Sequence, residues 1–204
     1  PLKTHCRSSF TDNPAFQQIS LQADSDYILF YTCTSPIELH PYAIGRMYQI
    51  AESNDGALFY SDYQEIRQGK KIHHPTLEYQ TGSIRNDFDF GQLLLFRNDS
   101  FQQVVAQMNT DYRFAALYEL RLSISRLGKI VHIPETLYTV QPTDLRLSGE
   151  KQFDYVDPAN REVQLEMEAV CTAHLQAIGA WLAPEFQRID FGQENFAREA
   201  SVII

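Results

Sequence analysis

The alternation of apolar and polar segments along the chain predicts an α/β fold. Residues 27–32 (YILFYT) are aromatic and β-branched without alternation, which is typical of a strand buried on both faces. Residues 41–54 have the apolar spacing of an amphipathic helix, and residues 57–62 (ALFYSD) are a second apolar strand. Strand, helix and strand within about 36 residues make a βαβ unit, so we expect the two strands to be parallel with a right-handed crossover.

The rest of the chain continues the alternation. A hairpin is predicted through Gln68–Gly69, and the longest helix is predicted over 158–182. This helix has an apolar stripe that ends at Trp181 and is expected to be a packing face against the rest of the protein. Its opposite, charged face, which includes Glu166, is expected to be solvated. The remaining predictions are helices after Asp12 or Asn13, over 100–108 and over 113–127, and strands over 92–98, 129–134 and 136–140.

The carboxyl ends of the two strands in the βαβ unit are the expected place for chemistry, because open α/β sheets bind their ligands there. These ends are Thr32–Ser35 and Ser61–Asp62. The first of them carries no charged residue at all. The sequence therefore predicts a ligand-binding edge that lacks acids and bases on one side.

Charge and composition narrow the classes of partner. The chain of 204 residues has a formal net charge of −9, and no basic run is longer than Lys70–Lys71. A nucleic-acid backbone or an anionic membrane surface needs clustered Lys and Arg, so neither is expected as the main partner. Three widely spaced cysteines without a C-x-x-C pair favour reduced thiols and a cytoplasmic location. No apolar run approaches the roughly 20 residues of a membrane-spanning helix.

Several strings of the chain resemble family 2 glycosyltransferases of the GT-A fold. Members of that family commonly carry a strand end of the form eyilflDsDd, the string vYsDydei before a gkr turn, and a helix eDyDLwlRlselgki that leads into ipEvLYtyr. The chain reads DYILFYTCTSPIEL (26–39), FYSDYQEIRQGKKIHHP (59–75) and LYELRLSISRLGKIVHIPETLYTV (117–140) at the matching places. The similarity spans about residues 24–141, and GKIVHIPETLYTV is its most specific part.

The resemblance implies a nucleotide-sugar-dependent glycosyltransferase of the kind used in bacterial polysaccharide synthesis. Its fold would be a GT-A-like mixed sheet flanked by helices, followed by a long C-terminal helix. Its partners would be a nucleotide sugar, a glycan acceptor and a second glycosyltransferase domain of the same chain. Residues 1–150 would form the first domain, 151–198 the long helix and a linker, and 199–204 (EASVII) the start of the second domain. The chain would then be a segment of a longer protein.

The chain also departs from the family at its catalytic positions. An Asp-x-Asp pair in the family holds a divalent cation that neutralises the departing diphosphate, and the aligned residues here are Thr32 and Thr34. The family's catalytic base aligns with Leu117, and only the following acid remains, as Glu119. The family's N-terminal strand is not evident in residues 1–26. The resemblance therefore implies a weakened or inactive domain that needs no cofactor, whereas an active domain would use Mn²⁺ or Mg²⁺.

Two groups of residues near the strand ends remain candidates for a site. Asp62 could contact a ribose, a sugar or a metal ion, together with Thr32 and Thr34 as substrate-binding residues. Asp87 and Asp89 form an acidic pair of their own that could hold a metal ion in place of the missing one, or could be part of a solvated turn that holds none.

The helix over 113–127 contributes two further candidates. Glu119 is the candidate catalytic residue, because this helix resembles the acceptor-side helix of the family and a general base must reach an acceptor hydroxyl. Its alternative role is an ion pair. Arg126 is a candidate for substrate binding, although a basic residue near the end of a helix also interacts favourably with the helix dipole.

Three hypotheses of function follow from these observations. The first is a family 2 glycosyltransferase in which this domain scaffolds an active partner or helps it bind the acceptor. The second is a live transferase that uses displaced acids, namely Asp62, Asp87, Asp89 or Glu119. The third is a non-catalytic interaction module that shares only the βαβ sheet.

Overall fold

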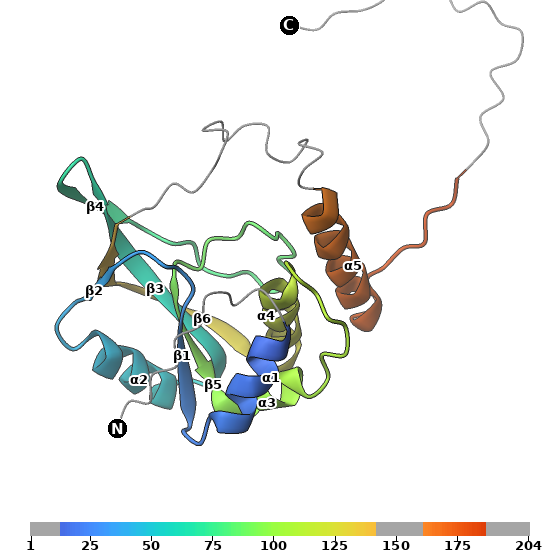
Figure 1. Ribbon diagram of the computed structural model, residues 1–204, viewed down its shortest axis with the longest axis horizontal. Coiled ribbons are helices and arrows are strands. Elements are labelled where there is room, and N and C mark those ends of the chain that lie inside the picture. The colour runs from blue at the N-terminus through green and yellow to red at the C-terminus, as the bar shows by residue number, and fades with distance from the viewer. Residues whose placement is uncertain (1–12, 142–160, 187–204) are drawn as a thin grey trace, which may run out of the picture.

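A computed structural model of the chain describes residues 13–141 and 161–186, which form a mixed, curled sheet with helices on both faces (Figure 1). The strands are β1 (Tyr27–Tyr31), β2 (Ile37–Leu39), β3 (Gly56–Arg67), β4 (Lys70–His74), β5 (Leu93–Arg97) and β6 (Lys129–Val140). The helices are α1 (Asn13–Gln22), α2 (Ala43–Ser53), α3 (Asn98–Val105), α4 (Ala116–Leu127) and α5 (Arg161–Ala177). The predicted α/β class is confirmed, including its C-terminal helix.

The order of strands in the sheet is β1-β5-β3-β6-β2, and β4 pairs with β3. Among the described strands only β3 and β6 are parallel neighbours, and the other pairs are antiparallel. Strands β1 and β3 are both antiparallel to β5, which lies between them, so they run in the same direction. The predicted common direction of the two strands is therefore confirmed, but they are not neighbours.

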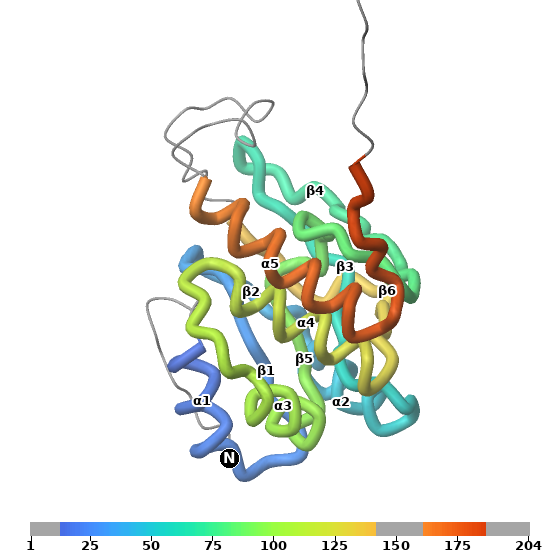
Figure 2. Tube along the Cα trace, turned by 90° about the vertical axis from the view of Figure 1, so that its right-hand side faces the viewer, coloured from blue at the N-terminus to red at the C-terminus, as the bar shows by residue number. Residues whose placement is uncertain are grey.

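Each face of the sheet has its own hydrophobic core, because alternate residues of a strand point to opposite faces. Leu58 and Tyr60 of β3 pack on the face that is covered by α1, α3 and α4, where Leu120 is fully buried. Phe59 packs on the opposite face against Met47 of α2. The view in Figure 2 shows α5 lying across α4, on the outside of the first layer.

Two predicted strand ends are wrong. Strand β3 continues past Asp62, and β6 runs through Pro134 as one strand where two were expected. The pairing of the two strands shifts at this point, since Ser61 lies opposite Ile133 but Asp62 lies opposite Thr136. Proline cannot donate a hydrogen bond to the ladder, so the strand accommodates it in an irregular stretch rather than ending there. Asp62 consequently lies inside the sheet and not at the end of a strand.

The predicted hairpin through Gln68–Gly69 is confirmed. Both residues have positive φ angles, 51° and 75°, as the central positions of a type I′ turn require. This turn joins β3 to β4, and the hairpin projects beyond the rest of the sheet (Figure 1).

The helix predicted over 113–127 is α4. Its predicted apolar line, Ala116, Leu120 and Ile124, is fully buried against the sheet. A charged residue, Arg121, lies next to this apolar line on the helix and is also buried. The helix therefore presents one cation to the interior.

The helix predicted over 158–182 is present as α5 and ends at Ala177. Trp181 lies beyond the helix and is 41% exposed, so the expectation that it packs within the helical stripe is wrong. The predicted start of this helix and the predicted second domain at 199–204 lie outside the described residues. Within the described ranges, no helix combines the length and apolarity that crossing a bilayer requires.

Gly91 supplies a first test of the fold. It has a φ of 68°, and a β-carbon at this position would collide with the hydroxyl group of Tyr138. We expect Gly91→Ala to lower the free energy of unfolding by about 1–3 kcal/mol, because of overpacking and a strained backbone. The matched control is Gly45→Ala in α2, where the added methyl group meets open space. We expect this variant to have a free energy of unfolding about 0.5–1 kcal/mol higher than the parent, because alanine is favoured over glycine in a helix. Urea denaturation measures both changes, and equal effects would contradict the packing described for Gly91.

Candidate functional site

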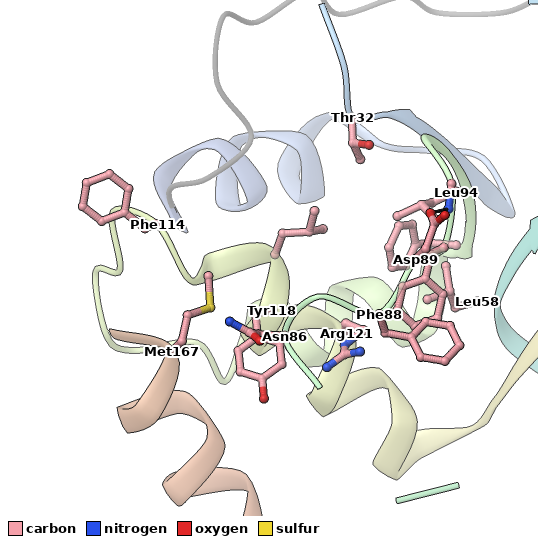
Figure 3. A pocket seen from close by; sticks show the side chains of 14 residues that line it. Thr32, Leu58, Asn86, Phe88, Asp89, Leu94, Phe114, Tyr118, Arg121 and Met167 are labelled. Carbon is pink, nitrogen blue, oxygen red and sulfur yellow. Dashed lines mark hydrogen bonds between the residues drawn. The ribbon is translucent and has the colours of Figure 1, made fainter. Parts of the chain in front are cut away.

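A pocket of about 260 Å³ lies between the residue that follows β1, the segment 86–91 and the start of α4 (Figure 3). Ligand pockets typically measure about 300–1,000 Å³, so this one has room for a molecule of about one ring. The apolar part of its lining includes Leu58, Phe88, Phe90, Leu94, Phe114, Leu117, Tyr118 and Met167, and the polar part includes Thr32, Asn86, Asp89 and Arg121. A mainly apolar wall with few polar groups is the usual composition of a small-molecule site.

Arg121 is the most unusual member of the lining. It is only 6% exposed, and none of its three guanidinium nitrogens has a hydrogen-bond partner among the described residues. Its guanidinium carbon lies 4.8 Å from the ring centroid of Tyr118 and 5.3 Å from that of Phe90. Burial lowers the pKa of the guanidinium, but an arginine keeps its charge in proteins. The pocket lining therefore contains a buried positive charge that lies against aromatic faces and has no hydrogen-bonded counter-ion among the described residues, although the charge of Asp87 acts on it.

The two acids of the neighbouring segment have other partners. Asp87 accepts two hydrogen bonds from Arg85, at 3.0 and 2.9 Å, and this contact lowers the pKa of the Asp87 carboxyl. Asp89 lies 2.8 Å from Nε2 of His74 and accepts the backbone N–H of Gly91 at 2.7 Å. Asp89 lines the pocket, whereas Asp87 does not. The predicted acidic pair is thus split between two different contacts.

The wall formed by α4 and α5 is held in place by Glu166. The carboxylate of this residue accepts the backbone N–H groups of Arg113, Phe114 and Ala115, at 3.1, 2.7 and 3.0 Å. These N–H groups precede the first turn of α4, whose own N-cap residue makes no side-chain hydrogen bond. Glu166 therefore caps α4 from another helix. The expectation of a solvated charged face is wrong for Glu166, whereas the other members of that face, Arg161, Glu162 and Glu168, are exposed. The next residue of α5, Met167, also lines the pocket (Figure 3).

The two threonines of the first strand end are placed differently. Thr32 lines the pocket, and its hydroxyl donates a hydrogen bond to the carbonyl of Gln92 at 3.3 Å. Thr34 is exposed and does not contribute to the pocket. Leu117, which aligns with the family's catalytic base, lines the same pocket as Thr32. The structure thus brings together two of the positions that the sequence comparison singled out.

Asp62 is buried away from the pocket. Its Oδ1 atom accepts hydrogen bonds from the N–H and the hydroxyl of Thr76, at 2.8 and 2.9 Å, and lies 2.8 Å from Nε2 of His132. Burial alone would raise the pKa of Asp62, but the donors from His132 and Thr76 outweigh burial, so the pKa is lowered. The carboxylate therefore fastens the segment after β4 to the irregular part of the sheet.

Glu119 and Arg126 lie on α4 but outside the pocket lining. Glu119 is half-buried, and its Oε2 atom has no hydrogen-bond partner among the described residues. Burial raises the pKa of its carboxyl, and the Asn13 amide and the charge of Arg126 offset this only in part. Arg126 is exposed and donates a hydrogen bond to the hydroxyl of Ser123 at 3.0 Å. Glu119, the candidate base, and Arg126, the candidate for substrate binding, thus both lie outside the pocket that Thr32 lines.

The positions of the possible metal-binding side chains bear on the prediction that Asp87 and Asp89 hold a metal ion. No group of three or more His, Cys, Asp or Glu side chains in residues 13–141 and 161–186 is arranged so that it could hold a metal ion. Asp87 and Asp89 point to separate partners, as described above, and do not converge on one point.

Sequence reasoning did not select Arg121 as a site residue, although the signal was present. An arginine placed four residues after Leu117 and three residues before Ile124 falls on the apolar stripe of the helix and not on its solvated face. A charge on an apolar stripe is rare without a partner, so such a position deserves testing as a binding residue. No known family model matches the chain, and no curated protein sequence is significantly similar to it.

Removal of the Glu166 carboxylate tests the cap of α4. We expect Glu166→Gln to lower the free energy of unfolding by about 1 kcal/mol, because a neutral amide oxygen is a weaker acceptor for the N–H groups of a helix N-terminus. Glu168→Gln, an exposed acid on the same helix, is the matched control and should change stability little. Hydrogen exchange of the amides at 113–115 measures the effect locally, and unchanged protection in Glu166→Gln would contradict the cap.

Glu119 gives a prediction of pH dependence. Its pKa is raised in the folded state, so folding disfavours the ionised form, and this destabilisation grows as the pH rises from the unfolded pKa through the folded pKa. We therefore expect Glu119→Gln to be more stable than the parent near pH 7 and to lose this advantage near pH 4. Urea denaturation at the two pH values measures the difference. A variant that is less stable than the parent near pH 7 would show that the ionised carboxylate is favoured after all.

Proposed function

We propose that the chain is a family 2-like glycosyltransferase domain of a nucleotide-sugar-dependent protein, and that this domain is weakened or inactive. Its pocket holds a sugar unit of the acceptor or donor, and a second domain of the same chain carries out the transfer. The setting is cytoplasmic polysaccharide synthesis of the bacterial type.

The support for this proposal is the meeting of Thr32 and Leu117 in one pocket. The first residue follows β1 and the second belongs to α4, and they are far apart in the sequence. In the family that the chain resembles, the aligned positions carry the cation-binding acid and the catalytic base. A glycosyltransferase cleft would join these two positions, and the pocket supports the proposal in that respect.

The side chains at the two positions decide what the pocket can do. A threonine hydroxyl does not supply the carboxylate charge that a divalent cation prefers, and a leucine cannot accept a proton. Aromatic walls and a few polar groups can nevertheless bind a small molecule without changing it. Binding without transfer is thus the activity that these side chains favour.

A non-catalytic interaction module is the second candidate. It is favoured by large apolar side chains beyond α5, since Leu182 and Phe186 are 89% and 92% exposed. Exposed apolar side chains that lie close together commonly mark contact surfaces. The two candidates differ in whether the pocket binds a sugar at all.

Calorimetric titration with UDP- and GDP-sugars, with manganese and then with a chelator, tests the proposal. We expect weak binding, with a Kd above about 0.1 mM, which the chelator does not change. We expect Leu117→Trp, which fills the pocket, to abolish this binding, and Leu127→Trp, at an exposed leucine of the same helix, to preserve it. Chelator-sensitive sugar transfer at an ordinary enzymatic rate would establish a live transferase, and binding that survives Leu117→Trp would favour the interaction module.

A further inference from the structure

We infer that the pocket binds one carboxylate-bearing ligand through Arg121, and that this ligand is a sugar acid of a single ring. The carboxylate follows from the contacts of Arg121 alone. The sugar ring rests on the proposed function. The two parts are therefore argued and tested separately.

The first step concerns the charge of Arg121. A buried ion without a partner is strongly unfavourable, so buried charges in proteins are normally paired. Here Arg121 is only 6% exposed and lines an open pocket, and its three guanidinium nitrogens are buried without a hydrogen-bond partner among the described residues. The nearest aromatic faces compensate only part of the lost hydration. An anion that enters the pocket supplies the missing partner once the Arg121 side chain turns its nitrogens toward it.

The second step concerns the kind of anion. A guanidinium donates two parallel hydrogen bonds, which match the two oxygens of a carboxylate or of a phosphate. The pocket offers a single positive charge, and the acidic Asp89 lines the same pocket. A dianionic phosphate would add two negative charges beside Asp89, whereas a carboxylate that pairs with Arg121 adds only one. The charges therefore favour a monoanion.

The third step concerns the body of the ligand. In Figure 3, Arg121 lies between Asn86 and Tyr118 on one side and Phe88 on the other. The volume of about 260 Å³ admits about one ring. Asn86 and the pocket-lining Thr32 offer amide and hydroxyl groups that can bond to sugar hydroxyls. A hexuronate unit satisfies the volume, the polar groups and the charge together.

Thermal unfolding with four probes tests the inference, namely glucuronate, glucose, glucose 6-phosphate and benzoate. The proteins are the parent chain, Arg121→Met and Arg126→Met, where Arg126 is an exposed arginine of the same helix that lies outside the pocket. We expect millimolar glucuronate to raise the Tm of the parent and of Arg126→Met by a few degrees and to leave Arg121→Met unchanged. Glucose should give a much smaller shift in all three proteins.

The unliganded variants give an independent readout. Because Arg121→Met replaces an unpaired buried charge by an apolar side chain of similar length, we expect its Tm without ligand to equal or exceed that of the parent. An arginine with a purely structural role would instead lower the Tm when it is removed. A lower Tm together with an unaltered response to glucuronate would overturn the inference.

The remaining outcomes separate the two parts of the inference. Equal shifts with glucose and glucuronate would overturn the carboxylate site and leave the proposed sugar-binding function standing. A shift with benzoate but not with glucuronate, lost in Arg121→Met, would overturn the sugar acid and with it the proposed function. A larger shift with glucose 6-phosphate than with glucuronate would overturn the carboxylate in favour of a phosphate.

Discussion

The site depends on one carboxylate that closes the open end of a helix. The first N–H groups of any helix need acceptors, and the residues that lead into α4 provide none from their own side chains. Glu166 of α5 accepts the N–H groups of Arg113, Phe114 and Ala115, the three residues that lead into α4. Because Phe114 lies in the capped segment and Met167 follows Glu166, the same contact sets the distance between two walls of the pocket. The C-terminal helix is therefore part of the site and not an appendage.

The second constraint is the isolation of the positive charge on Arg121. Two acids lie in the adjacent segment, but Asp87 is bound by Arg85 and Asp89 contacts His74. These contacts leave the guanidinium against two aromatic rings, without a hydrogen-bonded acid among the described residues, in a residue that lines the pocket. A folded protein can retain an unfavourable buried charge of this kind where a bound ligand makes use of it. The arrangement of the surrounding ion pairs is thus as important as the arginine itself.

Local patterns were sufficient to predict most of the elements. The apolar run at 27–32 forms a strand, the line Ala116, Leu120 and Ile124 is buried, and Gln68–Gly69 forms the expected turn. The predictions failed for features of the sheet that are determined by pairing between segments distant in the sequence. The first failure is the strand order, since β5 lies between β1 and β3. The second is β6, which continues through Pro134 because its pairing with β3 tolerates an irregular stretch there. Neither the choice of partner nor this tolerance is encoded within a few neighbouring residues.

The sequence alone determined the chemistry of each position, since a threonine or a leucine carries no carboxylate in any fold. It therefore already defined Thr32 and Leu117 as residues without acid or base function. Only the tertiary structure decided that these two residues share a pocket, that Arg121 is buried there with no hydrogen-bond partner in the described part of the chain, and that Glu166 caps a helix. The physical reason is that burial and the pairing of charges depend on contacts between segments far apart in the chain, which no local pattern records.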